Sequence, residues 1–253
     1  MDWIFVGDAH FSQKERERRE RFISFIRENS DSLGTLVIMG DLFDFWFGFR
    51  DLTPLRNEYA DILDLLEGIR KEGVEVIYLE GNHDFRLGPY MSDELGFQIY
   101  HRSTEIDLDG SKIYLAHGDW AYPKLGHRIF SSLLRNRFTY KLISWLGPEI
   151  VIRIAKWLSA GSRNRGIERP SEISSRIRKF AHKMLNEGFD VVILAHTHLP
   201  EVMTVERKSG TGYYFNVGNW MKDFSYLRYN VENGFSLEYF SEEKKGGIAS
   251  PSC

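Results

Sequence analysis

Polar residues of three types stand directly after five short apolar segments of the chain. These types, Asp, His and Asn, bind divalent ions such as Mn²⁺, Fe²⁺ and Zn²⁺. Five of the eight histidines fall in these clusters, a concentration that random placement would rarely produce. In chain order the clusters are Asp8-Ala9-His10, Gly40-Asp41-Leu42-Phe43-Asp44, Gly81-Asn82-His83-Asp84, His117-Gly118-Asp119 and Ala195-His196-Thr197-His198.

The clusters offer more ligands than one ion can use, which favours a site for two ions that share a bridging carboxylate. Paired ions about 3.5–4 Å apart are a known means of hydrolysing phosphoryl esters. Taken singly, each residue also has an ordinary explanation: Asp8 and Asp41 suit helix caps or turns, and His117 suits a buried core histidine. The prediction therefore depends on the ordered set of five clusters.

The apolar segments before the clusters are predicted to be buried strands of an α/β sheet. Apolar residues at helical spacing predict a helix over 13–29 and another within 59–69, so that strands and helices alternate. Ligands of such sheets bind beyond the carboxyl ends of the strands, and all five clusters should meet there. The predicted strands are 3–7, 35–39, 74–79, 112–116 and 190–194.

Two later regions depart from this alternation. After His198, the segments 202–205, 213–217, 226–231 and 235–240 are predicted to be antiparallel strands, with turn signals such as Asn233-Gly234 between them. Apolar residues at helical spacing on both sides of Gly147-Pro148 predict a helical insertion of two or three helices. We expect one domain over 1–240, with the insertion at about 120–183 and a polar tail at 241–253.

Charge is unevenly distributed along the chain. The formal net charge is −3, which disfavours a nucleic-acid binder. Residues 120–183, however, hold 14 Lys or Arg and 3 Asp or Glu, a net charge of +11, so the rest of the chain carries −14. This basic segment is either a solvated helical face or a surface that binds an anionic substrate or membrane.

The sequence predicts a cytoplasmic protein, soluble or attached to a membrane surface. Cys253 is the single cysteine and has no partner for an internal disulfide. The apolar stretch near the N-terminus is too short for a signal peptide, and no uncharged apolar stretch reaches 18 residues.

In this order, the clusters resemble the motifs of the calcineurin-like metallophosphoesterase superfamily. That pattern runs Asp-x-His, Gly-Asp-x-x-Asp, Gly-Asn-His-Asp, His and Gly-His-x-His, and this chain departs from it only at Ala195, where the family usually has Gly. The resemblance implies a four-layer α/β/β/α sandwich. It also implies two sets of metal ligands: Asp8, His10, Asp41 and His198 for one ion, and Asp41, Asn82, His117 and His196 for the other.

The resemblance further implies that His83 is catalytic and binds no ion. Its imidazole would bind the phosphoryl oxygens and could protonate the leaving group. Asp84 would orient His83 by a hydrogen bond, and Asp44 would support the ligands from behind.

Within the superfamily, the chain is similar to the UDP-2,3-diacylglucosamine pyrophosphatase family of lipid A biosynthesis. Aromatic residues extend the second motif from Gly40 to Gly48, the third motif continues to Gly88, and the insertion falls where that family has a lipid-binding cap. One difference is His83, where many members have Arg. The resemblance implies release of UMP and 2,3-diacylglucosamine 1-phosphate, with Mn²⁺ as the expected ion.

The same reading predicts where this nucleotide-linked glycolipid would bind. Ser162, Arg163 and Arg165 follow the second predicted helix of the insertion and could grip phosphate or nucleotide, since Arg suits bidentate phosphate contacts. Trp46, in the aromatic extension, is a further expected substrate contact. The basic, apolar insertion could also lie on the inner face of the cell membrane.

Two alternative functions remain open. One is a phosphodiesterase or pyrophosphatase that acts on a soluble nucleotide or another phosphoester. The other is a binding or scaffold module that reuses the fold; it is disfavoured because all seven ligand positions and His83 are present.

Overall fold

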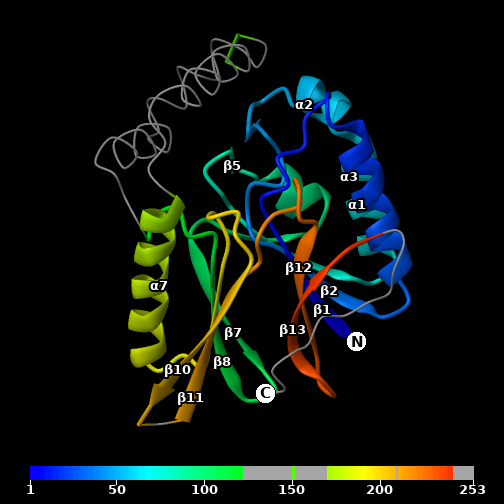
Figure 1. Cartoon of the computed structure of the whole chain (residues 1–253). Helices are drawn as coiled ribbons and strands as arrows, with labels where there is room; N and C mark the ends of the chain where they lie inside the picture. The colour runs from blue at the N-terminus through cyan, green and yellow to red at the C-terminus, as the bar shows by residue number, and fades with distance from the viewer. Residues whose placement is uncertain (122–149, 152–169, 209, 242–253) are drawn as a thin grey trace.

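Two mixed β-sheets lie at the centre of the structure, a computed structural model that describes residues 1–121, 150–151, 170–208 and 210–241 (Figure 1). The first sheet has the strand order β13-β12-β1-β2-β4-β6, with β1, β2, β4 and β6 parallel. Its strands are β1 (Asp2–Val6), β2 (Leu33–Ile38), β4 (Glu75–Leu79), β6 (Gln98–Tyr100), β12 (Ser225–Asn230) and β13 (Gly234–Tyr239).

The second sheet has the order β10-β11-β9-β8-β7, with β8, β9 and β11 parallel. Its strands are β7 (Ser103–Leu108), β8 (Ser111–Ala116), β9 (Val191–Leu194), β10 (Glu201–Arg207) and β11 (Gly210–Asn216). A separate two-stranded ladder pairs β3 (Trp46–Phe47) with β5 (Asp84–Phe85) and so joins the second and third clusters.

The two sheets pack face to face, and helices cover their outer faces (Figure 1). In β2, Leu36 and Ile38 point to the helices while Val37 points to the second sheet. Because both faces of the strand are buried, its sequence is continuously apolar. This explains why the strands before the clusters could be recognised from the sequence.

Helices α1 (Arg16–Asn29) and α3 (Ala60–Lys71) cover the first sheet, and α7 (Pro170–Asn186) covers the second. Phe22, Phe25 and Ile26 are the buried residues of α1, at the spacing that predicted a helix there. Two shorter helical segments are α2 (Thr53–Glu58) and a π-helix (Tyr90–Glu94). None of the helices in the described part of the chain is both long and apolar enough to cross a bilayer.

The chain therefore has the predicted α/β fold, and its two sheets are mixed, but two details were not predicted. The four C-terminal strands form antiparallel pairs that are divided between the sheets: β10 and β11 in the second, β12 and β13 in the first. Residues 170–183, predicted as part of the insertion, lie in α7 and pack against β9 and β11. The rest of the insertion and the tail lie almost wholly outside the described residues, and the domain boundaries stay a prediction.

Candidate metal centre

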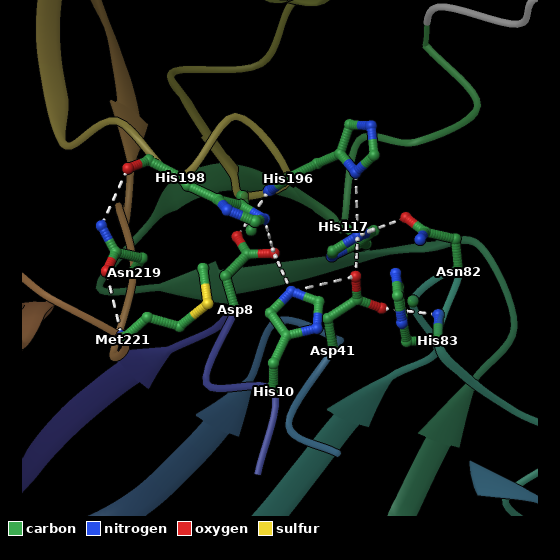
Figure 2. Close-up of polar contacts among 12 residues, drawn as sticks. Asp8, His10, Asp41, Asn82, His83, His117, His196, His198, Asn219 and Met221 are labelled. Carbon is green, nitrogen blue, oxygen red and sulfur yellow. Dashed lines mark hydrogen bonds and ion pairs between the residues drawn. The ribbon is translucent and has the colours of Figure 1, made fainter. Parts of the chain in front are cut away.

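The five clusters meet at the carboxyl ends of the strands, across the seam between the two sheets (Figure 2). The loops after β1, β2 and β4 belong to the first sheet, and those after β8 and β9 belong to the second. The side chains that they bring together are Asp8, His10, Asp41, Asn82, His83, His117, His196 and His198.

Two groups of side chains have the composition and spacing of metal sites. The ligand atoms of Asp8, His10 and His198 lie within 4.8 Å of one another, and so do those of Asp41, His117 and His196. These two groups fall within the two predicted ligand sets. A third group within the same distance joins His83 to His10 of the first group and Asp41 of the second. The first and second groups are therefore adjacent.

Individual distances show how closely the atoms approach. His198 Nε2 lies 3.2 Å from Asp8 Oδ1, and His117 Nε2 lies 3.5 Å from Asp41 Oδ2. His10 Nε2 is 3.8 Å from Asp8 Oδ1 and 3.7 Å from Asp41 Oδ2. Asn82 Oδ1 lies 3.3 Å from His117 Nε2, which places the amide at the second group. The structure thus brings all seven predicted ligands together; their roles as ligands stay predictions.

The donor atoms of this centre suit divalent ions. Asp8 Oδ1 and His10 Nε2 are buried and make no hydrogen bond among the described residues, although His198 Nε2 lies 3.2 Å from Asp8 Oδ1. A buried polar atom without a hydrogen bond is costly, and a cation shared between carboxylate and imidazole would satisfy both atoms. The centre therefore fits the two ions that its residue types predict.

The backbone at the centre is held in a conformation that non-glycine residues rarely adopt. Asp8, His10, Asp41, His196 and His198 all have positive φ angles, between 46° and 69°. Left-handed backbone costs non-glycine residues about 1–3 kcal/mol each and gathers at functional sites. The surrounding structure must hold these five residues in place.

Two glycines allow the second group to close. A Cβ on Gly81 would lie 2.0 Å from Asp41 Oδ1, and one on Gly40 would lie 2.6 Å from His117 Nδ1. Gly40 also has a φ of 91°, which favours glycine. Side chains at either position would displace the Asp41 carboxylate or the His117 ring.

Asp41 is ionised because histidines surround it. Burial alone would raise the pKa of Asp41, but His117, His83 and His10 outweigh it and hold this pKa well below its usual value. Burial would lower the pKa of His117, but Asp41 and Asp8 hold it well above the usual range. His117 Nδ1 lies 2.8 Å from the Met39 carbonyl oxygen; donation to that oxygen directs Nε2 toward Asp41.

His10 and His196 are neutral at physiological pH. Burial lowers the pKa of both to about 4, and nearby histidines add to this: His83 for His10 and His117 for His196. A neutral imidazole is the form that binds a metal ion.

His83 is oriented by contacts with the loop that follows β2. Its Nδ1 lies 2.9 Å from the Asp44 carbonyl oxygen, and its backbone amide donates to Asp41 Oδ1 at 2.8 Å. With Nδ1–H donated to Asp44, Nε2 is the atom that can meet a substrate oxygen. Asp44 was predicted to have a supporting role, and its main-chain oxygen contacts His83.

The predicted hydrogen bond from Asp84 to His83 is wrong. Asp84 Oδ1 accepts from the amides of Asp41 and Gly81, both at 2.9 Å. Its Oδ2 accepts from the Leu42 amide at 2.7 Å and from the Tyr78 hydroxyl at 2.5 Å. Asp84 therefore holds the loop that carries Asp41.

The predicted substrate contact of Trp46 is also wrong. Its side chain has no exposed surface and packs among Phe43, Tyr59 and Tyr90 in the core under the first sheet. Because β3 directs this indole inward, Trp46 is a packing residue. The other three predicted substrate contacts, Ser162, Arg163 and Arg165, lie outside the described residues.

The sequence reading missed the loop between β11 and β12. Asn219 donates from Nδ2 to the His198 carbonyl oxygen at 2.9 Å (Figure 2). The Trp220 amide donates to the Asp8 carbonyl oxygen at 3.3 Å. The available signal was the one used elsewhere: a polar residue, Asn219, follows the predicted strand 213–217.

The fold and the centre agree with comparisons to known proteins. Residues 1–220 match the family model of the calcineurin-like phosphoesterases, and the chain belongs to this family. It is therefore a metal-dependent hydrolase of phosphoesters.

More specific relatives share most of its length. Over 239 residues, 92% of this chain, it is 29% identical to a UDP-2,3-diacylglucosamine hydrolase of Yersinia pestis bv. Antiqua (strain Angola), 97% of which is covered. A hydrolase of the same name from Yersinia pseudotuberculosis serotype O:1b is 28% identical over the same coverage. Among solved structures, the Escherichia coli phosphoesterase Yfce aligns over 100% of this chain and 99% of its own, with a TM-score of 0.49 and 18% identity.

Proposed function

We propose that this chain cleaves the diphosphate of UDP-2,3-diacylglucosamine and releases UMP and 2,3-diacylglucosamine 1-phosphate. The observation that carries the proposal is the position of Asp41: its Oδ2 lies 3.5 Å from His117 Nε2 and 3.7 Å from His10 Nε2, between the two candidate metal groups. Similarity over 97% of a relative named UDP-2,3-diacylglucosamine hydrolase supports this substrate.

The residues of the centre would divide the work between them. Asp8, His10 and His198 would hold one ion, Asn82, His117 and His196 the other, and Asp41 both. The expected ions are Mn²⁺, with Fe²⁺ and Zn²⁺ as alternatives. When bound, such a pair supplies positive charge for the phosphoryl group and lowers the pKa of water.

His83 would contribute by hydrogen bonding and proton transfer. Its Nδ1 contact with Asp44 leaves Nε2 to donate to a phosphoryl oxygen as negative charge develops on it. Since Tyr78, Asp84 and the strained backbone fix the loops, the donors are in place before substrate binds.

The proposal extends to the lipid part of the substrate. Residues 120–169, the part of the predicted insertion that precedes α7, hold 10 Lys or Arg and 2 Asp or Glu. Their net charge of +8 and their many apolar residues suit a cap for a diphosphate with acyl chains. In this proposal, Ser162, Arg163 and Arg165 contact the nucleotide or phosphate. We further propose that the cap covers a four-layer sandwich and lies at the inner face of the cell membrane. The proposed partner is the glycolipid, and nucleic acid is not a proposed partner.

His83 favours a second candidate function. Many members of the UDP-2,3-diacylglucosamine pyrophosphatase family have Arg at this position, whereas His can also protonate a poor leaving group. That chemistry suits hydrolysis of a soluble nucleotide phosphodiester.

A paired assay distinguishes the two functions. Purified chain with Mn²⁺ is offered UDP-2,3-diacylglucosamine and, separately, a chromogenic phosphodiester, each with and without chelator. Chelator-sensitive release of UMP is the expected result. Cleavage of the soluble ester alone would contradict the lipid substrate, and the Asp41→Ala variant, which removes the shared carboxylate, serves as the inactive control for both.

A further inference from the structure

Two asparagines, one at the end of β11 and one in the loop after it, hold the turn that carries His196 and His198. Asn216 donates from Nδ2 to the Ala195 carbonyl oxygen at 2.9 Å, directly before His196. Asn219 donates from Nδ2 to the carbonyl oxygen of His198 itself, also at 2.9 Å. The two hydrogen bonds fix the backbone of the turn on either side of Thr197.

This turn needs external support. His196 and His198 have φ angles of 69° and 57°, so two strained residues flank Thr197. Such conformations persist where surrounding contacts determine them. Within the turn, the Thr197 amide donates to the Ala195 oxygen at 2.8 Å.

The asparagines are themselves fixed by short local bonds. Asn216 Oδ1 accepts from the Gly218 amide at 3.1 Å. Asn219 Oδ1 accepts from the amides of Met221 at 2.9 Å and Lys222 at 2.8 Å, while its Nδ2 also donates to Asp223 at 2.6 Å. Asn216 has no exposed surface and Asn219 is 3% exposed, so no solvent competes for these bonds.

Each asparagine serves a different metal group. The backbone that Asn219 holds carries His198, which pairs with Asp8 at 3.2 Å in the first group. The backbone that Asn216 holds leads into His196, which belongs with Asp41 and His117 in the second group. Trp220, which follows Asn219 in the chain, donates a hydrogen bond from its amide to the Asp8 carbonyl oxygen. This bond connects the first group to the same loop.

We propose that Asn219 and Asn216 are positioning residues that set the affinities of the two metal positions separately, Asn219 for the position at His198 and Asn216 for the position at His196. Partners behind metal ligands typically change metal affinity 10- to 100-fold. The inference rests on the two-ion part of the proposed function and not on its lipid substrate.

The test compares Asn216→Ser and Asn219→Ser by calorimetric titration of the metal-free chain with Mn²⁺. A serine hydroxyl can still accept from the nearby amides of the loop, but it is too short to reach the carbonyl oxygen of the turn. His198→Ala and His196→Ala identify which of the two binding steps belongs to which position. Thermal melting checks that each variant is folded.

We expect each serine variant to weaken one step about 10- to 100-fold and to leave the other nearly unchanged. The step weakened in Asn219→Ser should be the one missing in His198→Ala; the step weakened in Asn216→Ser should be the one missing in His196→Ala. Folded variants that lose both steps together, or neither, would overturn the inference.

A matched control and the wild type complete the test. Asn29 at the end of α1 also donates from Nδ2 to a carbonyl oxygen, that of Phe25 at 2.7 Å, but far from the carboxyl ends of the strands. Asn29→Ser should leave both steps intact. A wild-type chain that binds fewer than two ions would overturn the inference at its basis, whatever the outcome of the substrate assay.

Discussion

The Tyr78 hydroxyl donates a 2.5 Å hydrogen bond to Asp84 Oδ2, from within strand β4 to the carboxylate beneath the Asp41 loop. The same carboxylate accepts from the amides of Asp41, Leu42 and Gly81. Tyr78 thus acts on the metal centre through Asp84, although it contacts no ligand side chain itself.

Tyr78→Phe should therefore destabilise the protein. Burial and the charge of Asp41 raise the pKa of Asp84 to about 7, so its carboxylate is charged above that pH. A hydrogen bond to a charged group contributes about 1.5–3 kcal/mol, and urea unfolding at about pH 8 should show a loss of this order. Tyr59 offers a matched control, because its hydroxyl donates to a neutral acceptor, the Phe45 carbonyl oxygen, at 3.1 Å. Tyr59→Phe should cost about 1 kcal/mol; an equal or smaller cost at Tyr78 would contradict the role assigned to it.

Gly81→Ala should abolish activity. The new Cβ would lie 2.0 Å from Asp41 Oδ1 and 2.6 Å from the Asp41 nitrogen, so the shared carboxylate must move. Turnover and Mn²⁺ affinity should fall together in steady-state and titration measurements. Gly68→Ala in α3, where nothing lies within 4 Å of the new Cβ, should instead raise stability by up to about 1 kcal/mol and retain activity.

His83→Arg should separate the two candidate reactions. The leaving group of the proposed diphosphate cleavage is a phosphate monoester, whose second pKa of about 6 makes protonation unnecessary. A phosphodiester that releases an alkoxide needs the proton. We expect His83→Arg to retain release of UMP and to lose alkyl phosphodiester cleavage, whereas His83→Ala should lower both by about 10²- to 10⁴-fold. Loss of both reactions in His83→Arg would contradict this division.

Binding of the ions should release protons. Asp41 and Asp8 hold the pKa of His117 well above its usual value despite burial, and Asp8 likewise raises the pKa of His198. Both imidazoles are then protonated in the metal-free chain below these raised pKa values, and each must lose its proton to bind an ion. Mn²⁺ affinity should therefore rise with pH through the neutral range.

Calorimetry in buffers of different ionisation enthalpy measures this release directly. His10 and His196, with pKa values of about 4, are already neutral and should contribute nothing at pH 7. A binding enthalpy that does not depend on the buffer would show that no proton leaves.

The sequence predicted the strands before the clusters and their meeting place, because strands buried on both faces are continuously apolar. It did not predict β7, whose residues alternate between exposed and partly buried at the edge of the second sheet. It also gave no sign that the C-terminal strands divide between the sheets. Strand partners depend on tertiary contacts, and turn signals alone do not reveal them.

The roles of individual side chains were harder to predict than their positions. Asp84 follows His83 in the chain, which suggested a contact between them. In extended chain, however, neighbouring side chains point in opposite directions, and Asp84 begins β5. Trp46 in β3 is buried for a related reason: its strand directs the indole into the core.

The position of the centre across the seam of the two sheets has a consequence for resistance to heat and proteases. Asp8, Asp41 and Asn82 come from loops of the first sheet, His117 and His196 from loops of the second. Ions bound by both sets would hold the two sheets together. A ligand at 100 times its Kd raises the free energy of unfolding by about 2.7 kcal/mol. Without divalent ions the enzyme would then lose its activity, and a larger fraction of it would be unfolded and open to proteases. Its abundance in a cell would therefore follow the supply of divalent ions.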